Sequence, residues 1–178
     1  MKRRSLLIGA AGAAALSGGA GIWLLGPARP VTDMGDWSTV HHWLDRVVRT
    51  QATTRSGWSL PVVLQHLAQS IEYSLDGYPE LKPGWFRATV GALAGRTFQR
   101  LGAMHHGLDE PIPGAPALTE AALDSSAQRL RDAVLRFEAH RGTLQPHFAY
   151  GALDRESYAR AHLMHVADHA QLVRNAGE

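Results

Sequence analysis

The chain has 178 residues, enough for one domain with its own hydrophobic core, and 45% hydrophobic with 19% charged residues is ordinary for a globular protein. Its formal net charge is +2, but without Lys2, Arg3 and Arg4 it has 15 basic and 16 acidic residues, so the charge does not favour nucleic-acid binding. It has ten histidines and no cysteine. This excludes thiolate metal sites, cysteine nucleophiles and disulfides, and leaves imidazole and carboxylate as metal-binding side chains.

Residues 1–30 are predicted to be an export leader or a membrane anchor, and residues 31–178 the folded domain. A basic start precedes an uncharged run from Ser5 to Gly26, and the Arg3-Arg4 pair resembles a twin-arginine signal. Cleavage and retention both remain open, because the run is just long enough to span a bilayer. We expect an exported bacterial protein, periplasmic or anchored to the outer face of the inner membrane, which meets the membrane only through this leader.

The spacing of apolar residues predicts a first helix from Asp36, its N-cap, to about Ala52, and a second from Ser59 to Asp76. The second helix places polar and apolar side chains together on one stripe: Val62, Val63, His66, Gln69, Ser70 and Tyr73. Such a mixed stripe is unlike a plain packing face. It indicates that His66 faces a site, although a single histidine there is more often only a buried polar residue.

A weaker helical pattern runs from Gly84 to Leu101, and its Gly91 and Gly95 permit close backbone packing. A long proline-rich loop follows, and loops of this length often shape binding sites. His105 and His106 of this loop could line the mouth of a pocket. We leave both out of the predicted metal ligands, because loop histidines commonly face solvent.

Thr119 is predicted to cap a packing helix that runs to about His140, and Asp154 to cap a last helix that runs to Arg174. With five helices and no alternating strand pattern, the domain is predicted to be all-α. On the last helix one core-facing stripe holds Tyr158, His162, His165 and His169. The opposite side, with Ala167, is expected to face solvent, and Asp168 to point to the side.

Three imidazoles buried together are costly unless each finds a partner, and a metal ion that binds neutral imidazole nitrogen is one shared partner. His165 and His169 are spaced i, i+4, and His66 is the candidate that would complete the shell. We therefore predict these three as ligands of a divalent ion, zinc or nickel. His162 is either an alternative metal ligand, a residue that hydrogen-bonds to one of the ligands, or the general base.

Other polar residues near these stripes are predicted to act on a substrate. Tyr73 is a candidate catalytic group, and Gln69 and His147 are candidate substrate-binding groups. His147 precedes the last helix, where simple packing is the alternative.

Five segments carry a resemblance to a known family: WSLPVVLQHLAQSIEYSLDGYP (58–79), FRATVG (86–91), HGLDEPIPGAP (106–116), PHFAYGAL (146–153) and AHLMHVADH (161–169). They resemble the exported bacterial family called domain of unknown function 1569. One histidine on the second helix with an H-x-x-x-H pair on the last also resembles the DinB-like, YfiT-type metal-binding four-helix bundles. The order of the predicted helices itself indicates a four-helix bundle with an extra helix and a long loop between its second and third helices. The resemblance implies the bundle and the three-histidine site.

The family resemblance implies no particular reaction, so two classes of function remain open. In the first, the protein is a metal-dependent transferase or hydrolase of the envelope, acting on an unknown small molecule; the wider superfamily implies this chemistry by fold analogy only. In the second, it binds a metal or a small molecule without turnover, or the metal is structural. The sequence does not determine the oligomeric state, which is either a monomer or a homodimer.

Overall fold

The structure, a computed structural model, describes residues 34–55, 57–104 and 106–175, and this part of the chain is mostly helical. In chain order the elements are α1 (Trp37–Arg49), β1 (Thr53–Thr54), α2 (Leu60–Asp76), α3 (Gly84–Phe86), the π-helix η1 (Arg87–Gly91), α4 (Ala92–Leu101), α5 (Leu123–Ala139), α6 (Arg155–Ala170) and β2 (Val173–Arg174). The predicted all-α class is confirmed. The predicted leader and His105 lie outside the described residues. Within those residues, no helix has the length and apolar character that crossing a membrane requires.

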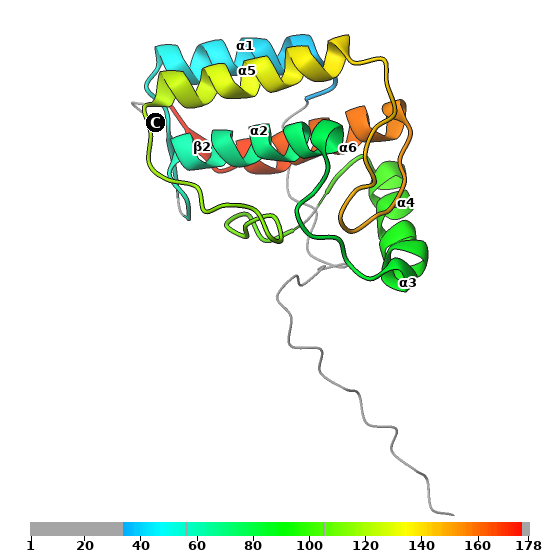
Figure 1. The fold of residues 1–178 in the computed structure, drawn as a ribbon. Coiled ribbons are helices and arrows are strands. Elements are labelled where there is room, and N and C mark those ends of the chain that lie inside the picture. The colour runs from blue at the N-terminus through cyan, green and yellow to red at the C-terminus, as the bar shows by residue number, and fades with distance from the viewer. Residues whose placement is uncertain (1–33, 56, 105, 176–178) are drawn as a thin grey trace, which may run out of the picture.

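The four long helices pack in two layers around one core. Figure 1 shows α1 beside α5 in one layer and α2 beside α6 in the other. Helices α1 and α5 contact each other, and α2 contacts both α5 and α6. The apolar faces of the two layers therefore meet between them. The largest fully buried apolar side chains of this core are Tyr158, Phe137, Leu44, Leu60, Leu64, Leu67, Ile71 and Leu130.

Two of the predicted helix starts have the expected caps. The Asp36 carboxylate accepts a hydrogen bond of 2.7 Å from the backbone N–H of Thr39, and the Asp154 carboxylate accepts one of 2.8 Å from that of Ser157. Each cap satisfies a backbone donor that the first helical turn leaves without a partner. The last helix therefore begins where predicted.

The predicted cap of α5 is wrong, because this helix begins at Leu123 and not after Thr119. The preceding segment is instead held by the start of α2. The Thr119 carbonyl accepts a hydrogen bond from the Gln65 side chain at 2.9 Å, and the Glu120 carboxylate accepts one from the Ser59 hydroxyl at 2.8 Å. These contacts join residues far apart in sequence, so the local pattern did not indicate them.

The predicted end of the last helix is also wrong. The helix ends at Ala170, and residues Val173–Arg174 form β2, which pairs antiparallel with β1. A two-residue strand has no alternation to recognise, so the sequence predicted no strand here. Ala167, expected on a solvated face, is buried in the main core, because α6 is covered on nearly all sides in its second half.

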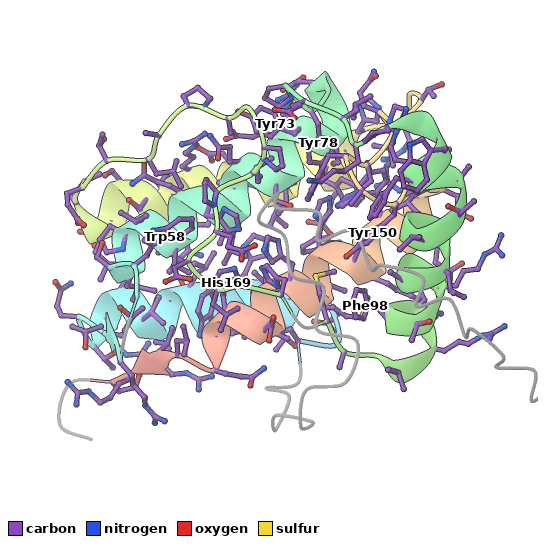
Figure 2. All side chains as sticks on the ribbon, turned by 90° about the horizontal axis from the view of Figure 1, so that it is seen from below. Trp58, Tyr73, Tyr78, Phe98, Tyr150 and His169 are labelled. Atoms are coloured by element: carbon purple, nitrogen blue, oxygen red, sulfur yellow. The ribbon has the colours of Figure 1, made fainter. Side chains whose placement is uncertain are left out.

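The segment from α3 to α4 lies across one end of the two layers (Figure 1) and packs closely, as its glycines predicted. A Cβ on Gly91 would overlap the Ala149 carbonyl oxygen, and one on Gly95 would lie 3.2 Å from the Tyr150 ring. Both glycines therefore permit the backbone approach. Figure 2 shows Phe98 and Tyr150 between α4 and α6, where they belong to a second, smaller core.

Candidate metal centre

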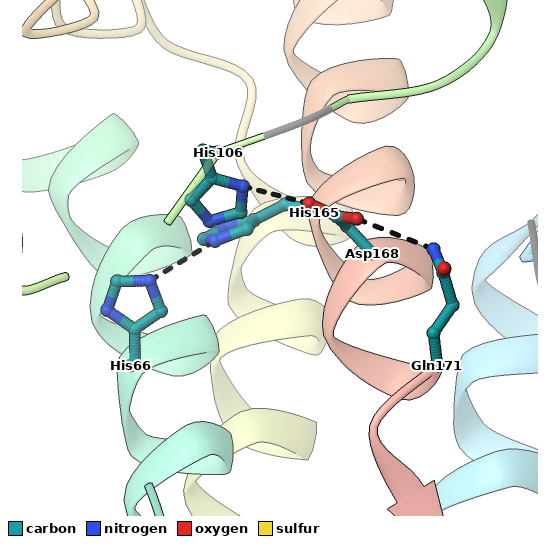
Figure 3. A network of polar contacts seen from close by, with 5 residues as sticks. All are labelled: His66, His106, His165, Asp168 and Gln171. Carbon is teal, nitrogen blue, oxygen red and sulfur yellow. Dashed lines mark hydrogen bonds and ion pairs between the residues drawn. The ribbon is translucent and has the colours of Figure 1, made fainter. Parts of the chain in front are cut away.

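Four histidines from three distant segments converge at the centre of the molecule. His66 comes from α2, His165 and His169 come from α6, and His106 comes from the loop between α4 and α5. One nitrogen of each ring lies within 4.8 Å of those of the other three. The Nε2 atoms of His66 and His165 are 3.2 Å apart (Figure 3). We call these residues the four-histidine cluster; it contains all three predicted ligands and one residue that was left out.

Several nitrogens of the cluster are buried without a hydrogen-bond partner. They are Nδ1 of His66, Nε2 of His106 and both ring nitrogens of His169. A buried polar atom without a partner costs roughly 1–3 kcal/mol. A metal ion would remove this cost for one nitrogen of each ring, because a neutral imidazole has one lone pair and carries a proton on its other nitrogen. Zinc–nitrogen bonds of about 2.0–2.1 Å place neighbouring ligand nitrogens of a tetrahedral site roughly 3.3–3.4 Å apart, close to the 3.2 Å between His66 and His165. The donor set therefore fits a divalent metal ion.

Burial keeps these rings in the form that binds a metal. Burial, followed by the positive charge that His106 can carry, lowers the pKa of His66 to about 3. The same two causes, in the same order, hold the pKa values of His165 and His169 well below the ordinary 6.5 of histidine. All three rings are thus neutral at pH 7, with a lone pair available for coordination.

His106, which was left out of the predicted ligands, lies in the four-histidine cluster. Its Nδ1–H donates a hydrogen bond of 3.0 Å to the Asp168 carboxylate, whose side chain is 1% exposed (Figure 3). The other carboxylate oxygen accepts a bond of 3.4 Å from the Gln171 side chain. With its proton on Nδ1, His106 has a lone pair on Nε2 directed to the cluster. A carboxylate behind a histidine in this way is the usual support of a metal-bound imidazole.

Asp168 was expected to point to the side, and it is instead buried against the loop that carries His106. The loop returns over α6 because two of its own apolar side chains, Met104 and Ile112, are buried. Apolar residues inside an otherwise polar, proline-rich loop are the signal that could have indicated a folded loop. The distance of about 60 residues between His106 and Asp168 hid their pairing.

His162 is buried but lies outside the four-histidine cluster. Its ring stacks on Tyr158, with centroids 5.4 Å apart, and meets the Phe137 ring edge-on at 5.3 Å. Burial lowers its pKa to about 3, and its Nε2 has no partner among the described residues. Its suggested roles as base or alternative ligand stay predictions.

His147 holds a tight loop through its ring. Its Nδ1 accepts hydrogen bonds from the backbone N–H groups of Ala149 and Tyr150 at 3.1 and 3.2 Å, and its ring stacks on the Tyr150 ring at 4.2 Å. Burial, followed by the charge His162 can carry, lowers the pKa of His147 to about 3. This is the loop on which Gly91 packs, so His147 supports the position of α4.

Gln69 and Tyr73 lie further along α2 than His66, one and two helical turns away. Gln69 is buried, and the half-buried Tyr73 ring lies 5.7 Å from that of Tyr78. Neither belongs to the cluster, and their substrate roles stay predictions. On the other side of His66, the Trp58 ring meets it edge-on at 5.2 Å and forms a wall of the site.

A surface hollow of about 490 Å³ between α2 and α5 lies apart from the cluster. Glu72 lines it and pairs with Arg129 through two hydrogen bonds of 2.9 and 2.7 Å. This carboxylate lies in the hollow and not in the four-histidine cluster. Asp168 is therefore the acidic group among the described residues that the structure places against the cluster.

The sequence was compared with known protein families, curated proteins and solved structures. No curated protein and no solved structure matches it. One family does, described as "Protein of unknown function (DUF1569)", and its match covers residues 32–176, which include all of the helices and the four-histidine cluster. The chain therefore belongs to this family of proteins of unknown function, DUF1569.

Proposed function

We propose that the protein binds a divalent metal ion, zinc or nickel, through His66, His165 and His169, with His106 as a fourth nitrogen ligand. The observation that carries the proposal is the convergence of four imidazoles, buried or half-buried, with one nitrogen of each ring within 4.8 Å of those of the other three. Asp168 supports it further, because it holds His106 in the tautomer that a metal requires. A bound ion would supply Lewis acidity toward an oxygen or sulfur ligand.

The first form of this proposal is a metalloenzyme, a transferase or hydrolase built on a DinB-like four-helix bundle. Three ligands stand on packed helices and are fixed, whereas His106 stands on a loop. A loop ligand can leave more easily than a helical one, which would open a coordination position for a small substrate. Gln69 and Tyr73, along the same helix as His66, would then contact that substrate.

The second form is a protein that holds the ion without turnover. Its specific support is His106 itself, because a fourth imidazole completes a tetrahedral shell, and closed four-ligand shells are typical of structural zinc. The two forms differ in one respect: whether an external ligand reaches the ion while all four histidines are present.

Elemental analysis tests the shared part of the proposal. The full chain, purified without a histidine tag, is expected to hold one equivalent of metal, and the His66→Ala variant to hold much less. His42→Ala is the matched control, because His42 is exposed on α1. Equal metal content in the wild type and His66→Ala would exclude the site.

Cobalt substitution separates the two forms. The visible spectrum of the cobalt protein reports coordination geometry. A spectral change on addition of a small thiol, with turnover on thiol-transfer or hydrolytic substrates, supports the enzyme. A tetrahedral spectrum that no added ligand changes, with no turnover, supports the structural ion.

We also propose that the protein is exported, and that residues 1–30 act as leader or anchor. The support is the sequence alone: the twin-arginine pair and the uncharged run after it. Fractionation of cells that express the full chain, with the mass of the mature protein, tests export and cleavage together. Recovery of full-length protein in the cytosol would contradict the proposal.

A further inference from the structure

The segment Gly84–Leu101, which we call the arm, carries most of the exposed apolar surface. Six large apolar side chains are exposed among the described residues, and five of them lie on the arm or directly before it: Leu81, Trp85, Val90, Leu93 and Leu101. Leu93 and Leu101 are 66% and 67% exposed. Clusters of exposed apolar side chains mark interaction surfaces, whereas single ones such as Leu135 need no explanation.

The arm has one face in the molecule and one face without a partner. Ala94 and Phe98 of α4 are buried against α6 and Tyr150. On the opposite side of α4 the exposed residues are Leu93, Arg96, Arg100 and Leu101. At about 100° per residue these four share one side of the helix, so two apolar and two basic side chains lie together there.

The charge of this region has one sign. From Leu81 to Leu108 the sequence contains Lys82, Arg87, Arg96 and Arg100 and no acidic residue. The nearby Glu156 of α6 is paired with Arg160 at 2.9 Å. An exposed helix with tryptophan and leucine beside arginine, and no acidic residue, has the composition of helices that lie in the interface of an anionic membrane.

We propose that the outer face of the arm docks on an anionic lipid bilayer, with Trp85, Leu93 and Leu101 in the interface and Arg96 and Arg100 at the headgroups. A second copy of the chain fits this face less well. A two-fold dimer through the arm would place the same arginines of both copies together, without carboxylates to pair them. The proposal does not depend on the metal centre.

A single fluorescent label tests the proposal, because the chain has no cysteine of its own. Leu93→Cys and Leu135→Cys each accept one environment-sensitive label at an exposed position, on the arm and on α5 respectively. The full-length proteins are incorporated into vesicles with or without phosphatidylglycerol. In anionic vesicles the label at position 93 is expected to shift to the blue and to be quenched by lipid-borne nitroxide, while that at position 135 stays accessible to aqueous iodide.

The two arginines of the arm provide a second test. Adding Arg96→Gln and Arg100→Gln to the Leu93→Cys protein should weaken docking roughly 30-fold, since each basic residue strengthens binding about fivefold near an anionic surface. Circular dichroism confirms that each variant is folded. Equal iodide access at positions 93 and 135 on anionic vesicles would overturn the proposal. So would shielding of position 93 that increases with protein concentration in the absence of lipid, because a second copy would then cover the face.

Discussion

Helix α6 carries two groups of buried histidine that differ in what surrounds them. His165 and His169 belong to the four-histidine cluster, where ring nitrogens face one another and mostly lack other partners. His162, one turn earlier, lies between the rings of Tyr158 and Phe137. The Tyr158 ring also lies 6.2 Å from that of His147, whose Nδ1 accepts hydrogen bonds from two backbone N–H groups. We call His147 and His162, together with the Tyr158 and Phe137 rings packed against them, the aromatic histidine group.

Burial alone therefore does not identify a metal ligand. Apart from the half-buried His106, the histidines of both groups are buried, and burial lowers the pKa of His66, His147 and His162 to about the same value, near 3. The groups differ in whether several lone pairs meet at one point. In the four-histidine cluster the lone pairs meet at one point, and this arrangement suits a cation. In the second, aromatic rings fill the space and the group packs the end of the molecule.

Removal of a ligand is expected to have the largest effect. His169→Ala should lose the bound ion, whereas His162→Phe, from the aromatic histidine group, should keep it. An ion at 1,000 times its Kd adds about 4 kcal/mol, so chelation should lower the Tm of the wild type by roughly 10 °C and leave that of His169→Ala nearly unchanged. Metal analysis and thermal unfolding with and without chelator measure this. Metal loss in both variants would remove the distinction between the groups.

Acid stability should depend on the aromatic histidine group. The pKa of His162 is lowered from 6.5 to about 3, so the ring is neutral when folded and takes up a proton on unfolding below pH 6.5. Its stabilising effect is complete above pH 6.5 and is lost as the pH falls toward 3. Between these two pH values, each such histidine lowers the free energy of unfolding by roughly 1.4 kcal/mol for each pH unit of acidification. Urea unfolding at several pH values should show a shallower dependence for His162→Phe.

An unchanged pH dependence in His162→Phe would show that His162 is protonated without unfolding. The wild type and His162→Phe differ at this residue alone and share the same four-histidine cluster, so acid release of the metal affects both proteins equally.

Loss of the carboxylate behind His106 should weaken metal binding without abolishing it. Asp168→Asn keeps the shape of the side chain but no longer holds the proton on Nδ1 of His106. The metal Kd should rise about 10–100-fold, the usual effect of removing such a partner. Competition with a chromophoric chelator measures it, with Asp132→Asn, an exposed carboxylate on α5, as the control. Equal affinity in the two variants would leave His106 outside the shell.

The smallest effect is expected for Tyr158→Phe. The Tyr158 hydroxyl donates a hydrogen bond of 2.6 Å to the Gln145 carbonyl, and its loss should lower the free energy of unfolding by about 1 kcal/mol. Metal content should stay unchanged, because this residue belongs to the aromatic histidine group. The urea midpoint and metal analysis of the same sample measure both. A fall in metal affinity would show that the two groups are coupled.

Much of the fold followed from local patterns in the sequence. Apolar spacing and the caps Asp36 and Asp154 indicated the helices, and the i, i+4 spacing placed His165 and His169 on one core-facing stripe. The mixed stripe of α2 indicated His66 as their partner, and the cluster contains it. These features are readable because helical periodicity is local and repeats within a few residues.

Only the tertiary structure showed that His106 and Asp168 lie at the site and that β1 pairs with β2. It also showed that α5 begins at Leu123 and not after Thr119. Each of these depends on a contact between segments distant in the sequence, and the irregular loop that carries His106 has no period from which its path can be read. The same holds for His162: its helical position shows that it is buried, but only the packed rings around it decide that it faces aromatic side chains and not the other histidines.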